Sequence, residues 1–260
     1  MPALETPSVK ALTLAAPFRW LRLGARDLWR NPLPGLMHGF LLAVFGAVLL
    51  AVAHDQFWWL AGAFSGFLIV APVLATGLYA VSRAAEREQK VSISEVLAIW
   101  ASQDKRLVSF GLLLGLAGTG WVLTSAGLIT LWAEAPVQKP EDFLRNVVLQ
   151  PNMGLFEVWL LLGTLLAAPV FASSVITLPM LVDQPVGLWS AVKRSWQVVA
   201  DQPTAMALWA LLIVLLVGLG FATFLVGLVV LVPWLGHASW HAYRELVPEP
   251  SSAKPRPPGS

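Results

Sequence analysis

Residues 33–53 of this chain read LPGLMHGFLLAVFGAVLLAVA, a stretch without one charged side chain. A helix needs about 20 mainly apolar residues to cross the hydrocarbon core of a bilayer, so we interpret this stretch as a transmembrane span. Further apolar stretches follow at residues 57–82, 107–132, 155–181 and 204–247. The last is too long for one helix and about right for two, with a turn expected near 221–224. The sequence therefore predicts six spans.

The composition of the whole chain agrees with a membrane protein. Of its 260 residues, 57% are hydrophobic and 12% are charged, against about 45–50% and about 25% in ordinary soluble domains. The chain has no cysteine, which excludes disulfides, thiolate catalysis and cysteine-ligated metal sites. A net charge of +2 creates no strong field that would attract nucleic acid, so we expect no nucleic-acid partner.

Lysine and arginine are divided unevenly among the connections between the spans. Five basic residues precede the first span, and five more lie between the second and third spans. The connections on the other side of the membrane would hold Lys139 and Arg145 alone. By the positive-inside rule, both termini lie in the cytoplasm. A five-span chain would place Arg244 and the basic residues after it outside, so six spans fit better.

An amphipathic segment precedes each pair of spans. In the first, Phe18, Leu21 and Leu28 fall on one side of a helix, and arginines fall on the other. Such a helix lies in the membrane interface, with its apolar side in the acyl boundary and its arginines toward anionic headgroups. Similar segments begin near Ile93 and Leu188. The membrane-interface residues predicted in this way are Arg19, Arg22, Arg26, Trp29, Arg30, Trp100, Lys193, Arg194 and Trp196.

These observations predict an all-α fold, a polytopic membrane protein with six transmembrane helices. They form three repeats of an interfacial amphipathic helix plus a transmembrane hairpin, at about 17–90, 91–183 and 184–247. The repeats make one membrane domain, 17–247, between an N-terminal cytoplasmic tail, 1–16, and a disordered cytoplasmic tail rich in proline and serine, 248–260. The second span of each pair contains an inner proline, at Pro72, Pro169 and Pro233, which kinks a helix.

A pair of histidines is the strongest candidate for a metal site. His237 and His241 are four residues apart in the sixth span, so both face the same side of the helix. Two imidazoles in this arrangement suit copper or zinc, and a haem would take a second histidine from another helix, such as His38. The alternative is a structural or interfacial role, because His241 lies near the cytoplasmic end of the span.

No catalytic constellation is visible in the sequence. It contains no glycine loop ending in Gly-Lys-Ser/Thr, no nucleophile-elbow serine and no His-Glu-x-x-His motif. We therefore expect a non-enzymatic inner-membrane protein that acts as a scaffold, assembly factor or subunit partner, with the lipid bilayer and other membrane proteins as its partners. The matched prolines leave open a permease-like transporter of a small or amphipathic solute. The histidines leave open a protein that binds haem or copper.

Three runs of sequence resemble a family of bacterial integral membrane proteins catalogued as domain of unknown function 2189. They are residues 20–32 (WLRLGARDLWRNP), 178–183 (LPMLVD) and 236–244 (GHASWHAYR). The resemblance extends over about residues 17–247. It implies a bacterial inner-membrane protein, and because the family has no assigned activity, it implies no catalytic residues.

Overall fold

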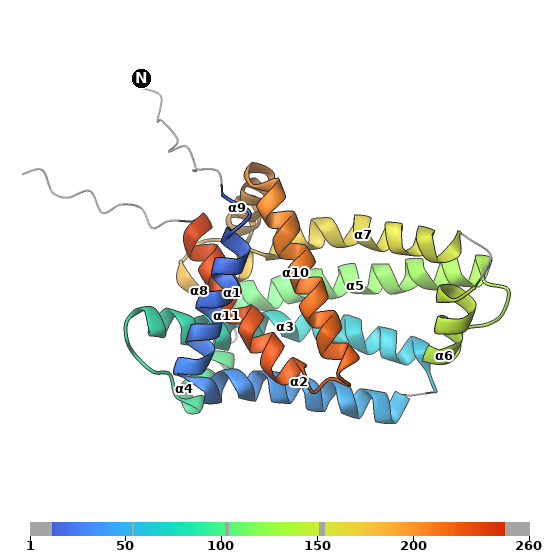
Figure 1. The fold of residues 1–260 in the computed structure, drawn as a ribbon, viewed down its shortest axis with the longest axis horizontal. Helices are drawn as coiled ribbons and strands as arrows, with labels where there is room; N and C mark the ends of the chain where they lie inside the picture. The colour runs from blue at the N-terminus through green and yellow to red at the C-terminus, as the bar shows by residue number, and fades with distance from the viewer. Residues whose placement is uncertain (1–11, 54, 102–103, 151–153, 248–260) are drawn as a thin grey trace, which may run out of the picture.

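The computed structural model describes residues 12–53, 55–101, 104–150 and 154–247. Within these residues the chain is helical and contains no strand, which confirms the all-α class (Figure 1). The predicted tail 248–260 and the first eleven residues of the predicted tail 1–16 lie outside them. The elements are α1 (Ala16–Arg30), α2 (Pro32–Ala53), α3 (Phe57–Glu86), α4 (Ile93–Ala101), α5 (Lys105–Trp132), α6 (Pro140–Phe143), the π-helix η1 (Leu144–Val148), α7 (Leu155–Ser174), α8 (Thr177–Asp183), α9 (Leu188–Asp201), α10 (Pro203–Ala222) and α11 (Leu228–Leu246).

The helix boundaries follow the local sequence. Asn31 ends α1, because the residue before a proline is disfavoured in helical conformation, and Pro203 opens α10, where its missing N–H costs nothing. Asp104 caps α5 by accepting a hydrogen bond from the backbone N–H of Arg106 at 2.8 Å. Each predicted span and each predicted interfacial segment is therefore helical, and the stretch 204–247 divides into α10 and α11.

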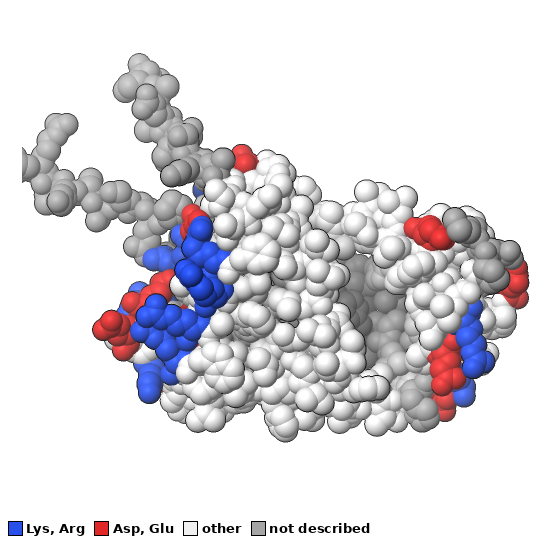
Figure 2. Space-filling model, viewed as in Figure 1, with Lys and Arg blue, Asp and Glu red and all other residues white. Residues whose placement is uncertain are grey.

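The membrane-spanning character of four stretches is clear from their length and composition. Pro32–Ala53, Lys105–Trp132, Leu155–Asp183 and Pro203–Ala222 are long and apolar enough to cross a bilayer. The helices α3 and α11 are not among them, so the predicted count of six is not confirmed. Figure 2 shows a broad uncharged band between two charged ends. Lys and Arg gather at the end where α1 and α4 lie, which we call the basic end.

The centre of the molecule is α11. It packs against α1, α2 and α3 and buries Trp240, Tyr243 and His237 completely or almost completely. Two glycines on neighbouring helices make this packing possible. A Cβ atom at Gly24 would lie 2.5 Å from the backbone nitrogen of Ala238, and one at Gly39 would overlap the backbone of Val229. Both positions therefore require glycine.

The turn between α10 and α11 is apolar and lies beside the middle of the first hairpin. Phe224 and Val226 are 90% and 71% exposed, and a Cβ atom at Gly46 would meet the side chain of Leu225 at 2.9 Å. Gly46 precedes the end of α2 by seven residues, or about 10 Å of helix. The tip of α10 and α11 therefore ends level with Gly46, short of the polar end of the first hairpin.

The amphipathic helix α1 differs in one respect from its prediction. Leu21 and Leu28 belong to its buried face, which includes Trp20 and Asp27 and packs on α11, whereas Phe18 is 55% exposed. The predicted apolar stripe is thus divided. One part packs against protein, and the remainder faces outward beside the exposed arginines.

Candidate functional site

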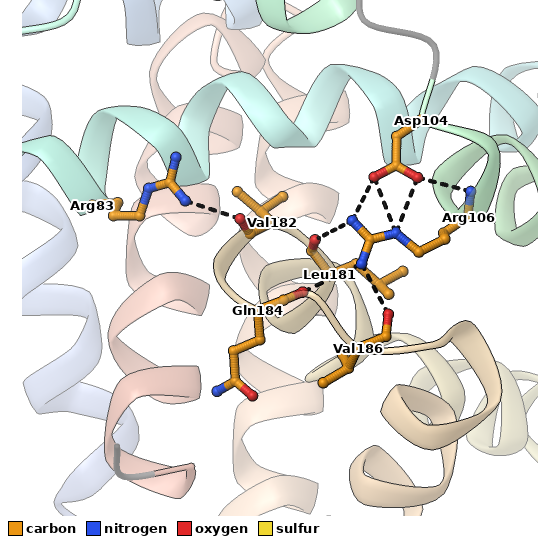
Figure 3. A network of polar contacts seen from close by, with 7 residues as sticks. All are labelled: Arg83, Asp104, Arg106, Leu181, Val182, Gln184 and Val186. Carbon is orange, nitrogen blue, oxygen red and sulfur yellow. Dashed lines mark hydrogen bonds and ion pairs between the residues drawn. The ribbon is translucent and has the colours of Figure 1, made fainter. Parts of the chain in front are cut away.

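A network of polar contacts holds α5 to the segment after α7 at the basic end (Figure 3). The guanidinium of Arg106 donates to both carboxylate oxygens of Asp104 and, on its other side, to three carbonyl oxygens at the end of α8. These carbonyls belong to Val186 at 2.8 Å, Leu181 at 3.1 Å and Gln184 at 3.3 Å. Every N–H of this guanidinium is therefore engaged.

A second arginine binds the same end of α8, and we call Arg83 and Arg106 with their partners the arginine cap. Arg83 of α3 donates to the carbonyl oxygen of Val182 at 2.9 Å, so two guanidinium groups meet the end of α8, where unpaired carbonyls and the helix dipole favour cations. The next residue, Asp183, accepts a hydrogen bond from the hydroxyl of Tyr243 at 2.7 Å. The Arg106 guanidinium beside Asp104 lowers the pKa of that carboxyl. These contacts join α3, α5, α8 and α11, and they have the form of a structural tie.

The three predicted histidines lie near one another in the fold but have different partners. His237 is fully buried, and its Nδ1 pairs with the hydroxyl of Ser82 at 2.8 Å. One turn later, Nε2 of His241 pairs with a carboxylate oxygen of Asp27 at 2.8 Å. His38 is buried on α2, and its Nδ1 donates to the carbonyl oxygen of Pro34 at 2.5 Å.

The Nε2 atoms of His38 and His237 are buried and have no hydrogen-bond partner among the described residues. In the same part of the chain, no three histidine, aspartate or glutamate side chains come together as a group that could hold a metal ion. A haem or copper site at His237, His241 and His38 stays a prediction. It is tested by optical spectra of the oxidised and reduced protein, with a His237→Ala/His241→Ala variant as the comparison.

The predicted interface residues occupy the basic end in two ways. Some attach the short helices to the bundle: Arg19 pairs with Glu245, Trp100 Nε1 donates to the carbonyl oxygen of Leu74 at 3.2 Å, and Trp196 Nε1 donates to the hydroxyl of Ser173 at 2.9 Å. The others that were predicted there are exposed or half-buried. They are Arg22, Arg26, Trp29, Arg30, Lys193 and Arg194.

An apolar groove separates α5 from α7 along much of their length. It forms a cavity of about 960 Å³ whose lining includes Gly120, Trp121, Trp159 and Gly163. Leu160 also lines it and is 51% exposed, so the groove opens sideways onto the apolar band. No charged side chain contributes to its lining. Such a surface suits an apolar ligand that reaches it from within the membrane.

Two contacts join α5 and α7 beyond the middle of the groove, away from the basic end. The indole Nε1 of Trp159 donates to the hydroxyl of Ser125 at 2.5 Å, and the Trp121 and Trp159 rings lie 5.3 Å apart. The groove itself exists because small residues leave space. A Cβ atom added at Gly120 would meet nothing within 4 Å.

Sequence analysis did not identify this groove. Most of its lining comes from two helices separated by the connection 133–154, with Trp189 and Val192 added from α9. Single tryptophans, threonines and glycines in apolar spans look like ordinary packing residues. The role of Arg106 was also missed, although its neighbour Asp104 is a typical helix cap that could have indicated a helix start. The end of α8 is a partner that no local pattern specifies.

Comparison with known families supports the resemblance found in the sequence. A family model described as "Predicted integral membrane protein (DUF2189)" matches residues 59–183, so the resemblance is confirmed over that segment. The matched segment includes α5, α7 and α8, and therefore most of the groove lining and both arginines of the cap, whereas Trp189 and Val192 of the groove lie beyond it. The runs 20–32 and 236–244 lie outside it. No curated protein and no solved structure matches the chain.

Proposed function

From the match to a family of integral membrane proteins and the geometry of the groove, we propose that this chain is a non-enzymatic membrane protein that binds an amphiphile between α5 and α7. The observation that carries the proposal is the cavity of about 960 Å³, which is apolar and open toward the lipid. It shares the amphipathic solute with the permease-like alternative that the sequence left open, but it includes no transport step. The scaffold and assembly roles stay predictions, because no particular contact among the described residues favours them.

The shape of the groove suits a lipid-like ligand. Along α5, the lining residues run from Phe110 to Thr124, or about 21 Å of helix. A long and narrow apolar groove of this kind accommodates extended acyl chains.

The proposal is tested by filling the groove. Gly120→Phe places a ring in the cavity, and Gly127→Phe places the same ring on the same helix outside the lining. We expect Gly120→Phe to lower the amount of lipid that stays bound through a fixed delipidation protocol, measured by native mass spectrometry. Gly127→Phe should retain the wild-type amount. Equal retention in all three chains would contradict the proposal.

The six-span topology and the threefold repeat also belong to this proposal. Each interfacial helix is joined to a helix with an inner proline, α1 to α11, α4 to α3 and α9 to α7, and this order supports the repeat. The tryptophan donor lies on the interfacial helix in α4 and α9, whereas at α1 it lies on α11. The bonds run from Trp234 Nε1 to the carbonyl oxygen of Leu21 at 2.7 Å, from Trp100 Nε1 to the carbonyl oxygen of Leu74 at 3.2 Å, and from Trp196 Nε1 to the Ser173 hydroxyl at 2.9 Å.

Cysteine labelling tests the orientation. The wild-type chain contains no cysteine, so single cysteines at Glu88 and Gln138 report on opposite ends of the bundle without background. We expect a membrane-impermeant maleimide to label the two positions from opposite sides, with Glu88 accessible from the cytoplasm. Labelling of both from one side would contradict the topology.

A further inference from the structure

A second cavity lies against the basic end of the groove. It has a volume of about 540 Å³, and it differs from the groove in having charged groups in its wall. Leu113 and Trp189 line both cavities, so the two are adjacent. The remaining lining residues of the smaller cavity are Lys105, Arg106, Ser109, Leu112 and Leu188.

The polar groups of this smaller cavity favour an anion. The guanidinium of Arg106 is occupied by Asp104 and the end of α8. Lys105 is exposed and forms no ion pair with any described residue, so its ammonium group is available. Ser109 adds a hydroxyl that can donate a hydrogen bond. Neither cavity has an aspartate or glutamate in its wall, so nothing there repels a negative charge.

The start of α9 adds to this preference. Leu188 and Trp189 are its first residues, and its N-cap, Gly187, provides no side-chain cap. The first turn contains no acidic residue, so its free N–H groups favour an anion beside Lys105. Trp189 also places an indole ring where the polar cavity meets the apolar groove, a position that suits this side chain at a membrane interface.

From these two adjacent cavities, we propose that the amphiphile is an anionic phospholipid. Its phosphate group lies beside Lys105 and Ser109 at the start of α9, and its acyl chains lie in the groove between α5 and α7. This inference rests on the proposed function and deepens it by naming the headgroup chemistry. A zwitterionic lipid would fill the same groove, but its headgroup has no net charge, and Lys105 would repel the ammonium group beside its phosphate.

The test is a competition between two lipids for the full chain in detergent. The chain is incubated with equal amounts of dioleoyl phosphatidylglycerol and dioleoyl phosphatidylcholine, and the retained lipids are counted by native mass spectrometry. We expect phosphatidylglycerol to be enriched about fivefold, because one cation near the membrane surface contributes on that order. Lys105→Gln should reduce this ratio to near one by lowering the amount of phosphatidylglycerol that is retained.

A matched control is Lys193→Gln, which removes another exposed lysine of the basic end that lines neither cavity. It should keep the wild-type ratio. Equal retention of both lipids by the wild type, or an unchanged ratio in Lys105→Gln, overturns the headgroup inference. It leaves the proposed function standing provided that Gly120→Phe still lowers total retention. If Gly120→Phe has no effect on retention, the groove itself is not the site and both proposals fail.

Discussion

Two antiparallel helix pairs, α2 with α11 and α5 with α7, both carry glycines in their facing surfaces, yet they pack in opposite ways. Between α2 and α11, Gly39 lies against the backbone of Val229 with no room for a Cβ atom. Between α5 and α7, Gly120 faces open space, and the two helices enclose a cavity of about 960 Å³. Glycine therefore allows close contact between the backbones of the first pair and leaves space between the helices of the second.

The difference teaches where stability and function are located. The α2–α11 pair packs closely where Gly35 and Gly39 of α2 meet Pro233 and Val229 of α11, and α11 also packs against α1 and α3. The α5–α7 pair is held at its two ends. Arg106 and the end of α8 hold it at the basic end, and Trp159, Ser125 and an apolar cluster that includes Ile129 and Leu155 hold it beyond the middle of the groove. The first pair is therefore a rigid support, and the second is a site with space for a ligand.

The largest expected effect comes from adding a side chain at Gly39, where α2 and α11 are in close contact. Gly39→Leu would force a side chain into the backbone of Val229, which cannot move aside as a flexible side chain could. Overpacking of this kind costs about 3 kcal/mol or more, so we expect a large loss of folded protein, measured by its unfolding midpoint in detergent. Gly62→Leu, where a Cβ atom meets nothing within 4 Å, is the control. A wild-type midpoint for Gly39→Leu would show that the two pairs do not differ.

The second effect concerns the tie at the basic end of the open pair. Arg106→Ala leaves the carbonyls of Leu181, Gln184 and Val186 without this donor. Hydrogen bonds from a charged donor of this kind are worth about 2 kcal/mol together, because the side chain is partly exposed and solvent replaces some of them. Hydrogen exchange should become faster at residues 181–186 while the core of α11 stays protected. Faster exchange throughout the molecule would show that the tie belongs to the core.

A smaller effect of pH acts on the same tie. The pKa of Asp104 is lowered by its hydrogen bonds with Arg106, so the stability that this carboxylate contributes is present above its ordinary value of about 4. That contribution is lost as the pH falls from there through the lowered pKa. We expect the unfolding midpoint to fall in this acidic range, and Asp104→Asn to lose the part of the dependence due to this group. An identical acid profile in both chains would contradict the assignment.

The smallest expected effect is that of a side chain added in the open groove. Gly120→Leu should change the free energy of unfolding by less than about 1 kcal/mol, because a Cβ atom there meets no neighbour within 4 Å and leucine favours a helix more than glycine does. The measurement is the same unfolding midpoint used for Gly39→Leu. Destabilisation of similar size at both positions would remove the distinction between the two pairs.

The sequence predicts the helices well because each depends on a local pattern. The apolar stretch 33–53 is long enough for α2, and the proline after Asn31 marks the boundary with α1. The sequence does not predict how α1 is used. Leu21 and Leu28 have the spacing of an interfacial helix, but their partner is α11, near the other end of the chain.

The candidate site was beyond sequence analysis for a similar reason. His237 and His241 have the spacing of a shared ligand pair, but their partners, Ser82 and Asp27, lie on two other helices. In the sequence, Lys105 is only one of several basic residues that precede a predicted span. Its place at the mouth of a groove depends on Trp189, which follows it by more than 80 residues.

By itself, the sequence determined that this is an all-α membrane protein, because the length of an apolar run and the spacing of charges are local and survive any arrangement of the helices. The tertiary structure alone decided which glycines face the backbone of another helix and which face open space. Gly39 and Gly120 look alike in their own spans, and the difference lies in what faces them, the backbone of Val229 in one case and empty space in the other. Such facing surfaces are set by packing between helices that are far apart in the chain, so no local sequence pattern predicts them.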